Sequence, residues 1–364
     1  LITISRQAVL HNYDYIQNLH PTCQIWPVLK SNGYGHGIAQ IAEIMKARSF
    51  EYFVVDSYYE ALKIWEISNQ KVLLIGPPPW QNLEYFNYNR LALTVYNLQM
   101  LDHLGKLSKT IKIHLKINTG MNRQGIKIEE VAGFLKVLQK YPRLELEGVC
   151  SHLASADDEQ ANDYTKMQED KFLAALEQIK QAGFVPKYLH LANTPGTTKI
   201  KNKICNTIRL GLGLYGLNPT GRQDSSWQEL NGLRPALRFT SKISHILELE
   251  TGEKVSYGGT FTAPKKMRIA LLPVGYYEVF TRSMSNRAVV KCEGRFLPLV
   301  GNICMNLSLF DCGGLDLKIG QEVEIISSWT QDANSVYKLA ELSGTIPYEI
   351  LVNLAESLRR EVVA

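Results

Sequence analysis

This sequence lacks closely spaced cysteines of the kind that pair or bind a metal. Its six cysteines lie far apart, and it contains no CxxC motif. The eight histidines never recur four residues apart beside an acidic residue, so the usual helical metal-site spacing is also missing. In a chain of 364 residues, scattered cysteines are typical of reduced thiols in the cytoplasm. We therefore expect a cytoplasmic protein without a metal site.

Long hydrophobic runs and blocks of like charge are absent as well. No apolar run approaches the ~18 residues needed to cross a membrane, and residues 1–17 lack the pattern of a signal peptide. The formal net charge of +5 is small for this length, and the basic residues are dispersed. A nucleic-acid-binding surface would need a denser basic patch. We therefore expect neither a membrane nor a nucleic acid as a partner.

Short apolar runs alternate with helical segments up to about residue 216. Eight of these runs indicate strands: 24–30, 52–57, 71–76, 91–96, 111–117, 145–152, 188–193 and 207–214. Amphipathic segments lie between them, as at 36–49 and 127–141, and Ser5 can cap a helix that precedes the first strand. Hydrophobic strands that alternate with helices form parallel sheets covered on their faces. Eight such units predict an α/β fold, a closed (β/α)₈ barrel of the TIM type.

The pattern changes from about Leu233. Short strands with alternating hydrophobicity follow one another, and helical patterns return only at 335–342 and 349–362. This indicates a smaller, mainly β C-terminal domain. We predict a barrel domain over residues 1–230, whose first few residues can join the β domain, and a β domain over residues 231–364.

Polar side chains collect at the ends of the predicted barrel strands. In a barrel of this type the active site lies at the carboxyl ends of the strands. Lys30 ends the first strand, and Arg209 lies in the last one. The others are Asn118, Thr119, Asn122, Arg123, Ser151, His152, Asn193 and Thr194. Side chains that only faced solvent would be scattered, so this rim is a candidate active site.

A glycine-rich run, Gly211–Gly216, follows Arg209 and extends past the end of the last predicted strand. It matches the GxGxxG dinucleotide fingerprint, but no helix follows it, so that interpretation fails. Barrels often bind phosphate with the loops after strands 7 and 8, where Asn193 and Thr194 could add donors. A phosphate site and a lone lysine, Lys30, on one rim suggest a phosphorylated aldehyde held as a Schiff base. Pyridoxal phosphate is the cofactor that uses such a lysine.

Seven motifs resemble those of the alanine racemases, pyridoxal-phosphate enzymes of fold type III, in order and spacing. They are VLKSNGYGHG, KINTGMNRQGI, SHLASADD, HLANTPGT, IRLGLGLYGLNP, KVSYGGTF and TIPYEIL. The resemblance covers essentially the whole chain. It implies an amino-acid racemase that interconverts L- and D-alanine through a pyridoxal-phosphate aldimine and supplies D-alanine for peptidoglycan.

The resemblance also implies roles for individual residues. Lys30 would form the aldimine and act as one of two acid/base groups, and Tyr257 would act from the opposite face of the substrate. The implied cofactor-binding residues are Lys30, Tyr34, His152, Asn193, Thr194, Arg209, Gly211, Leu212 and Tyr348. A head-to-tail homodimer is implied, in which the opposing subunit brings Tyr257 to the site.

Four further implications concern charge and the substrate. Arg209 resembles the arginine that faces the pyridine nitrogen of the cofactor and keeps it unprotonated, which favours reprotonation of the substrate over transamination. Arg123 resembles the residue that contacts the phenolic oxygen of the cofactor and the substrate carboxylate. Met305 resembles the residue of the opposing subunit whose backbone contacts the substrate carboxylate. Lys116 matches a lysine that is carbamylated in many members and helps to position that arginine.

Three motifs depart from the family pattern. KINTGM has Asn118 where the family has an aspartate, and Gly275–Val279 reads GYYEV in place of GYADG. GNICMN has Asn302 and Asn306 in place of an arginine and an aspartate. The last two replacements suggest the loss of an ion pair, and losing both partners can cost little. We expect the chemistry to be kept.

Three other functions stay open at this point. A racemase of broader specificity could arise through the altered entrance. A fold type III decarboxylase of basic amino acids is less favoured, because such enzymes pair the pyridine nitrogen with a glutamate where this chain has Arg209. A carrier or regulatory protein for pyridoxal phosphate usually comprises the barrel alone, whereas this chain has a full second domain with Tyr257.

Overall fold

The computed structural model describes residues 1–200 and 202–364, which form two compact units. The barrel unit comprises residues 9–31 and 41–234. The β unit comprises residues 1–8, 32–40 and 235–364. The domain limits of 1–230 and 231–364 stay a prediction. Within the described part of the chain, every helix is too short or too polar to cross a lipid bilayer.

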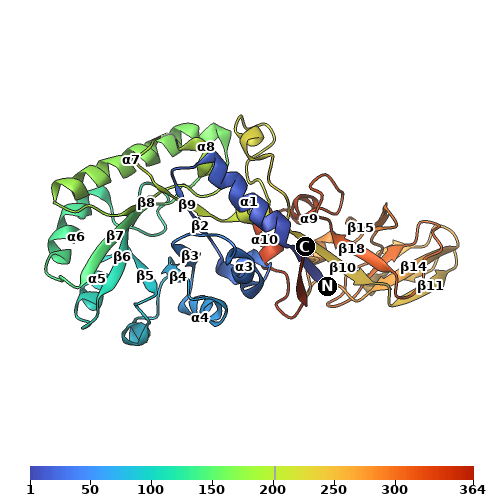
Figure 1. The fold of residues 1–364 in the computed structure, drawn as a ribbon. Helices are drawn as coiled ribbons and strands as arrows, with labels where there is room; N and C mark the ends of the chain where they lie inside the picture. Colours follow the sequence, from blue (N-terminus) through green and yellow to red (C-terminus); the bar gives the residue numbers. More distant parts are fainter. Residues whose placement is uncertain (201) are drawn as a thin grey trace. The chain divides into compact units, whose positions relative to one another are not determined.

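The barrel unit is built on eight parallel strands (Figure 1). They are β2 (Gln24–Pro27), β3 (Tyr52–Val55), β4 (Lys71–Leu74), β5 (Leu91–Val95), β6 (Ile111–Lys116), β7 (Leu144–Cys150), β8 (Tyr188–His190) and β9 (Thr207–Leu210). Strands β3 to β8 pair in chain order, and β2 pairs with β9. A bridge between Val28 and Val54 joins β2 to β3. The backbone N–H of Arg209 donates to the carbonyl of Ala192, just after β8. The ring therefore closes, and the predicted (β/α)₈ barrel is confirmed.

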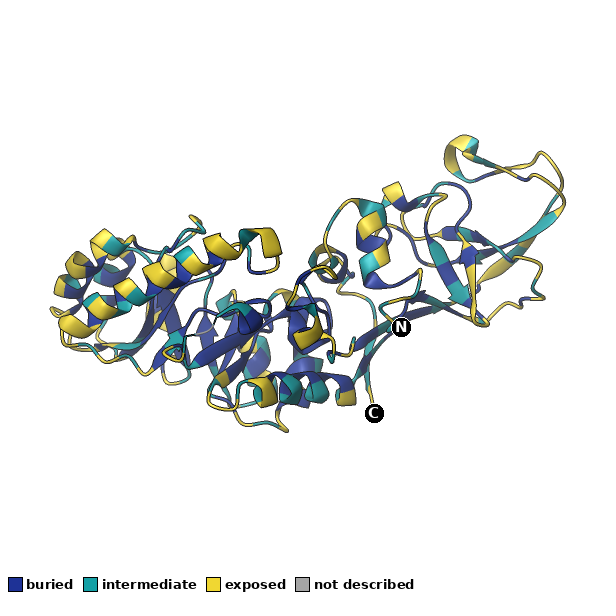
Figure 2. Ribbon diagram, turned by 90° about the horizontal axis from the view of Figure 1, so that it is seen from above, coloured by how far each residue is buried: buried dark blue, intermediate teal, exposed yellow. Residues whose placement is uncertain are grey.

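Helices alternate with these strands and bury one side each. They are α1 (Arg6–Leu19), α2 (Lys30–Tyr34), α3 (Ile38–Met45), α4 (Tyr58–Ile67), α5 (Leu98–Gly105), α6 (Val131–Leu138), α7 (Asn162–Gln181) and α8 (Gly196–Lys199). Short 3₁₀ helices are η1 (Trp80–Tyr85), η2 (Ile128–Glu130), η3 (Glu159–Ala161), η4 (Leu212–Tyr215) and η5 (Trp227–Leu230). Figure 2 shows the barrel strands largely buried and the longer helices buried on one side only. The hydroxyl of Ser5 accepts from the backbone N–H of Ala8, 3.2 Å away, and caps α1 as predicted.

The β unit contains the first and last strands of the chain. Its six-stranded sheet has the order β16-β15-β18-β10-β1-β19. These strands are β16 (Arg295–Pro298), β15 (Val289–Cys292), β18 (Glu322–Ile326), β10 (Leu237–Lys242), β1 (Ile2–Ser5) and β19 (Arg360–Val363). A three-stranded sheet of β11 (His245–Leu249), β14 (Met267–Leu272) and β17 (Ser308–Asp311) and a pair of β12 (Lys254–Val255) and β13 (Phe261–Thr262) complete it. The short helices are η6 (Tyr257–Gly259), η7 (Arg282–Met284), α9 (Val336–Ser343) and α10 (Pro347–Val352).

Two sequence predictions of local structure were wrong. The helix expected over 349–362 ends at Val352, and β19 follows it because this segment pairs with β1, almost the whole chain length away. The first barrel strand ends at Pro27 rather than at Lys30, which instead begins α2.

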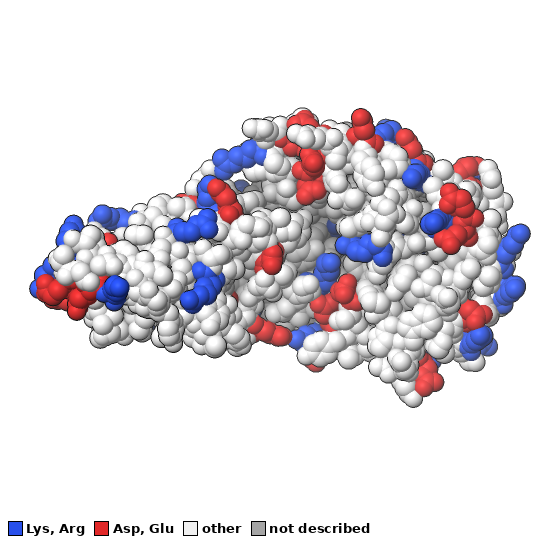
Figure 3. All heavy atoms as spheres, turned by 180° about the vertical axis from the view of Figure 1, so that it is seen from behind, with Lys and Arg blue, Asp and Glu red and all other residues white. Residues whose placement is uncertain are grey.

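Surface charge is mixed in sign. On the face drawn in Figure 3, lysine and arginine lie among aspartate and glutamate in small groups rather than in one basic patch.

Candidate active site

The backbone after Lys30 turns in an unusual direction. Four consecutive residues have positive φ: Ser31 (55°), Asn32 (54°), Gly33 (60°) and Tyr34 (50°). This is the left-handed helical region, which costs about 1–2 kcal/mol for each residue that carries a Cβ. Such strain persists only where surrounding contacts hold it, and it is concentrated at functional sites. The strained turn directly after Lys30 therefore indicates that Lys30 belongs to a functional site.

Two side-chain hydrogen bonds hold the beginning of the turn. The carboxylate of Glu60 accepts from the backbone N–H of Ser31 at 2.6 Å and also completes the capping box of α4 with Ser57. The side-chain oxygen of Asn32 accepts from the N–H of Ile38 at 2.9 Å, which begins α3. The two contacts tie the first two residues of the turn to the starts of regular helices, so the strained backbone is anchored where it begins.

The rim of the barrel is strongly electropositive. His152 follows β7, and its pKa lies well below the usual value because it is buried and because Arg209, Lys116, Arg123 and Lys30 all act on it. Within residues 1–200 and 202–364, neither the ammonium of Lys30 nor the guanidinium of Arg123 forms a hydrogen bond or an ion pair. Cations gathered without a partner suit an anionic ligand.

Lys116 ends β6 and is buried, with 8% of its surface exposed. Burial lowers its pKa to about 8, and the neighbouring cations Arg209, Arg123 and Lys30 act in the same direction. Its Nζ donates to the side-chain oxygen of Gln124 at 3.0 Å. A lysine with this pKa is partly neutral near pH 7 and can therefore react as a nucleophile.

Arg209 lies in β9 and is held by neutral acceptors. Its two terminal nitrogens donate to the backbone carbonyls of His190 and Ser151, each at 2.7 Å. They also lie 2.7 Å from Nδ1 of His190 and 3.3 Å from Nδ1 of His152. None of the groups that bind its two terminal nitrogens is a carboxylate, although the side chain is almost fully buried.

The segments after β8 and β9 meet at the predicted phosphate site. The hydroxyl of Thr194 accepts from the backbone N–H of Gly213 at 3.0 Å. A Cβ at Gly213 would lie 2.8 Å from Cγ2 of Thr194 and 2.9 Å from Cδ1 of Leu210, so a larger residue would have to displace these side chains. Gly211 caps η4, which begins at Leu212, and both residues are buried. The first N–H groups of a helix have no partner within the helix. Asn193 uses its side-chain oxygen to accept from Gly196.

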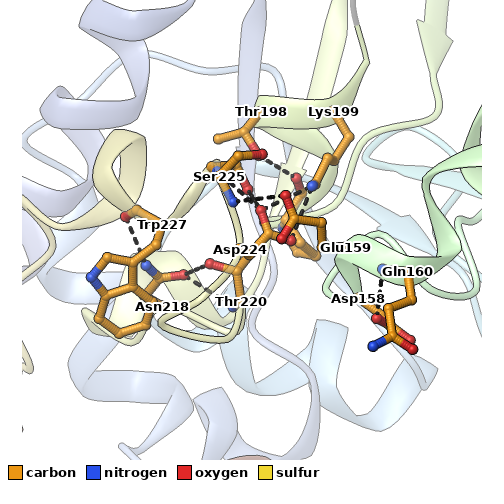
Figure 4. A network of polar contacts seen from close by, with 12 residues as sticks. Asp158, Glu159, Gln160, Thr198, Lys199, Asn218, Thr220, Asp224, Ser225 and Trp227 are labelled. Atoms are coloured by element: carbon orange, nitrogen blue, oxygen red, sulfur yellow. Dashed lines mark hydrogen bonds and ion pairs between the residues drawn. The ribbon is translucent and has the colours of Figure 1, made fainter.

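An ion pair fastens these two segments further out (Figure 4). The Nζ of Lys199, in α8, lies 2.9 and 3.0 Å from the two carboxylate oxygens of Asp224, in the segment after η4. Both side chains are buried, so this pair is well screened from water. The hydroxyl of Ser226 also donates to Asp224 at 2.5 Å, and Asn218 and Thr220 bond to each other nearby. The loops that carry Thr194 and Gly213 are thereby held in register.

The β unit carries the remaining predicted residues. Tyr34 is buried, which raises the pKa of its phenol to about 12, and its ring centroid lies 6.1 Å from that of Tyr348 in α10. Tyr257 begins η6 and is 69% exposed, and Met305 is 57% exposed.

Two of the departures from the family pattern have a structural explanation. The amide of Asn302 donates to the backbone carbonyl of Tyr257 at 2.6 Å. The amide of Asn306 donates to the carboxylate of Glu278 at 2.8 Å, and the other oxygen of Glu278 accepts from the N–H of Gly275. Neutral amide hydrogen bonds therefore occupy the places where the sequence suggested a lost ion pair.

Sequence reasoning missed polar residues inside the barrel. His114 lies on β6 and bonds to His190 on β8 and to Glu147 on β7, and His190 in turn bonds to Arg209. His114 lies two residues before Lys116 on the same strand, so the two side chains face the same side. That two-residue spacing could have identified His114 as a polar residue on the same face of the strand as Lys116. The roles of all predicted site residues stay predictions.

Comparison with known proteins gives one consistent family. The alanine racemase N-terminal domain matches residues 4–219, and the alanine racemase C-terminal domain matches residues 236–362. The chain is 34% identical to the alanine racemase of Geobacter sulfurreducens, over 97% of this chain and 94% of that protein. It is 32% identical to that of Staphylococcus epidermidis, over 99% of this chain and 93% of the relative.

Solved structures agree with this result. The alanine racemase of Clostridium difficile superposes with a TM-score of 0.91 at 28% identity, covering 100% of this chain and 95% of that one. The alanine racemase of Bacillus anthracis with bound L-Ala-P has a TM-score of 0.91 at 29% identity, covering 100% of this chain and 94% of that one. The resemblance noted in the seven motifs is thus confirmed over both units, and the chain belongs to the alanine racemase family of isomerases.

Proposed function

We propose that this chain interconverts L- and D-alanine with pyridoxal phosphate as cofactor and with Lys30 and Tyr257 as the two proton-transferring groups. The observation that carries the proposal is Lys30, which stands directly before the strained turn and whose ammonium forms no hydrogen bond within residues 1–200 and 202–364. Lys30 acts on the buried imidazole of His152 together with the cations Lys116, Arg123 and Arg209.

The donor groups of the rim suit this cofactor. Pyridoxal phosphate is anionic at its phosphate and at its phenolic oxygen, and the unpaired cations and buried N–H groups described above match both. When bound, it withdraws electrons from the substrate and makes the Cα proton acidic. The residues that would hold it are Lys30, Tyr34, His152, Asn193, Thr194, Arg209, Gly211, Leu212 and Tyr348.

Proton transfer needs two groups on opposite faces of the substrate. Lys30 would exchange a proton with Cα from one face, and Tyr257 would do so from the other, so that removal on one side and return on the other invert the centre. Arg123 and the backbone at Met305 would bind the substrate carboxylate between them. Arg209 can only donate, so it would face a nitrogen that carries no proton, which favours return of the proton to Cα over other reactions.

A head-to-tail homodimer is part of the proposal. Asn302 binds the carbonyl of Tyr257, and the segments that follow Asn302 or pair with it carry exposed aromatic and apolar side chains: Tyr276, Tyr277, Met305 and Leu307. The N–H groups of Tyr276 and Tyr277 donate to the carbonyls of Cys304 and Met305, so these residues form one surface. Grouped exposed aromatic and apolar side chains are typical of a protein interface. The supply of D-alanine for peptidoglycan and a cytoplasmic location stay predictions that rest on the family.

The direct test is the loss of optical activity from L-alanine on protein that shows the visible absorbance of bound cofactor. L-Serine and L-lysine are measured in parallel, because a broader racemase would act on them at comparable rates. We expect alanine to be preferred, Lys30→Ala to abolish both absorbance and activity, and Tyr257→Phe to keep the absorbance while losing most of the activity. Bound cofactor with no racemization of any of the three amino acids would refute the proposal.

A further inference from the structure

A continuous chain of side-chain hydrogen bonds runs through the interior of the barrel. Nη1 of Arg209 lies 2.7 Å from Nδ1 of His190, and Nε2 of His190 lies 2.8 Å from Nδ1 of His114. Nε2 of His114 lies 3.3 Å from a carboxylate oxygen of Glu147. The four residues come from β9, β8, β6 and β7, and β6, β7 and β8 are successive neighbours (Figure 1).

The residues at both ends of this hydrogen-bond chain require that each hydrogen bond be donated in the direction from Arg209 towards Glu147. A guanidinium can only donate, so Nδ1 of His190 must accept, and its proton must lie on Nε2. Nδ1 of His114 then accepts from His190, and its own proton lies on Nε2, facing Glu147. A carboxylate can only accept, so the far end agrees with the near end. A second proton on either imidazole would bring two N–H groups face to face.

Burial supports these charge states. Both imidazoles are fully buried, and burial lowers the pKa of each, so both are neutral. Burial also opposes the charge of Glu147, but hydrogen bonds from His114, Lys112 and Tyr52 outweigh it and lower its pKa to about 2. The ring of Trp26 packs 5.2 and 5.8 Å from the two imidazoles and keeps the chain in apolar surroundings.

We propose that Glu147 is the remote counter-charge of Arg209, and that His190 and His114 are positioning residues that connect the two. The inference deepens the proposed function and rests on its assignment of Arg209 to the ring nitrogen of the cofactor. A buried arginine needs an anion, yet a carboxylate beside that nitrogen would favour its protonation. With two neutral, polarised imidazoles between them, the carboxylate of Glu147 lies at the far end of the hydrogen-bond chain from Arg209. The guanidinium of Arg209 can then only donate hydrogen bonds.

The first test uses the unaltered holoenzyme. Solid-state ¹⁵N NMR of protein labelled at histidine distinguishes protonated from unprotonated ring nitrogens. The signals are assigned by their loss in His114→Asn and His190→Asn. We expect both rings to be neutral, each with its proton on Nε2, at pH 7. A proton on Nδ1 of either ring, or a doubly protonated ring, would overturn the inference whatever the enzymatic activity is.

The second test compares Glu147→Gln with Lys112→Gln. Both break the same ion pair between Glu147 and Lys112, but only the first removes the carboxylate from the chain. We expect Glu147→Gln to lower kcat by about tenfold or more, as removal of groups that orient a binding residue does, and to shift the absorbance band of the bound cofactor. Lys112→Gln should keep both. Equal effects in the two variants, or none in either, would sink the role of Glu147. A wild-type enzyme that binds the cofactor but racemizes nothing would instead count against the proposed function.

Discussion

The side-chain amide of Asn302 holds the backbone carbonyl of Tyr257 through a 2.6 Å hydrogen bond. Tyr257 follows Ser256, whose φ of 60° is strained, and precedes two glycines with positive φ, so the turn has little regular structure of its own. We predict that Asn302→Ala lowers kcat about fivefold with a small effect on KM, because one hydrogen bond of about 1 kcal/mol is lost from the group that positions the phenol.

Asn306→Ala is the matched control for that variant. It removes an amide from the same loop, but one that binds Glu278 rather than the Tyr257 turn. Steady-state kinetics on both variants decide the matter: equal losses of kcat would mean that the loop as a whole, and not the bond to Tyr257, sets the rate.

Lys116 should carry a carbamate. With a pKa of about 8, about one molecule in ten has a neutral amine at pH 7, and that amine can attack CO₂, forming an N–C bond and releasing a proton. The product replaces a cation by an anion among Arg123, Arg209 and Lys30, which is electrostatically favourable. ¹³C NMR in labelled bicarbonate should show one carbamate signal that disappears in Lys116→Ala.

Lys112 provides the internal control for this experiment. It lies on the same strand, but the hydrogen bond that its ammonium donates to the carboxylate of Glu147 raises its pKa, so its amine stays protonated. The carbamate signal should therefore survive in Lys112→Gln, and a signal that survives in Lys116→Ala would contradict the assignment.

Gly213→Ala should weaken cofactor binding. The new methyl group would lie 2.8 Å from Thr194 and 2.9 Å from Leu210, and relieving such overlap typically costs about 1–3 kcal/mol. Because Thr194 is the side chain displaced, we expect the Kd for pyridoxal phosphate to rise about tenfold or more. Titration followed by cofactor absorbance measures it. Gly221→Ala adds a methyl group with nothing within 4 Å, and similar affinities in the two variants would disprove the packing argument.

His36 should make stability depend on pH. It is fully buried, which lowers its pKa to about 4 from 6.5. Above pH 6.5 the ring is neutral in both the folded and the unfolded chain, so stability is unaffected. As the pH falls from 6.5 to about 4, only the unfolded chain takes up a proton readily, and about 3 kcal/mol of unfolding free energy is lost.

Urea unfolding at pH 7.5 and at pH 5 can isolate this effect. Nδ1 of His36 donates to the carbonyl of Tyr34 at 3.0 Å, and His36→Asn can keep a donor at that place without the titratable ring. The variant should lose stability at both pH values but show a smaller difference between them. An unchanged difference would show that the pH dependence comes from other buried groups, such as His114 and His190.

The barrel could be predicted from the sequence because its strand and helix patterns repeat eight times. The C-terminal segment could not, because its structure depends on pairing with a strand far away in the sequence. Eight apolar runs separated by helical periods indicate eight strands whatever their exact limits, and the structure has them. The segment after Val352 is different, because its helical pattern is overridden by pairing with β1. No local pattern records a partner that lies more than 350 residues earlier.

The site was predictable where polar residues follow strands and not where they lie within them. Lys30, His152 and Thr194 stand out because they interrupt apolar runs at strand ends. His114 and Glu147 lie within strands, where alternation alone does not distinguish the inside of a barrel from its outer face. The bond from Asn302 to Tyr257 was invisible for another reason, since it joins segments 45 residues apart.

The left-handed turn after Lys30 also has a consequence for the order of folding. Four successive residues with positive φ are disfavoured in an isolated chain, so the turn cannot act as an early local nucleus. Its anchor, Glu60, takes up its position only once α4 has formed. We therefore expect this segment to be unformed in the folding transition state, with substitutions at Ser31 or Asn32 changing the unfolding rate and leaving the folding rate almost unaltered.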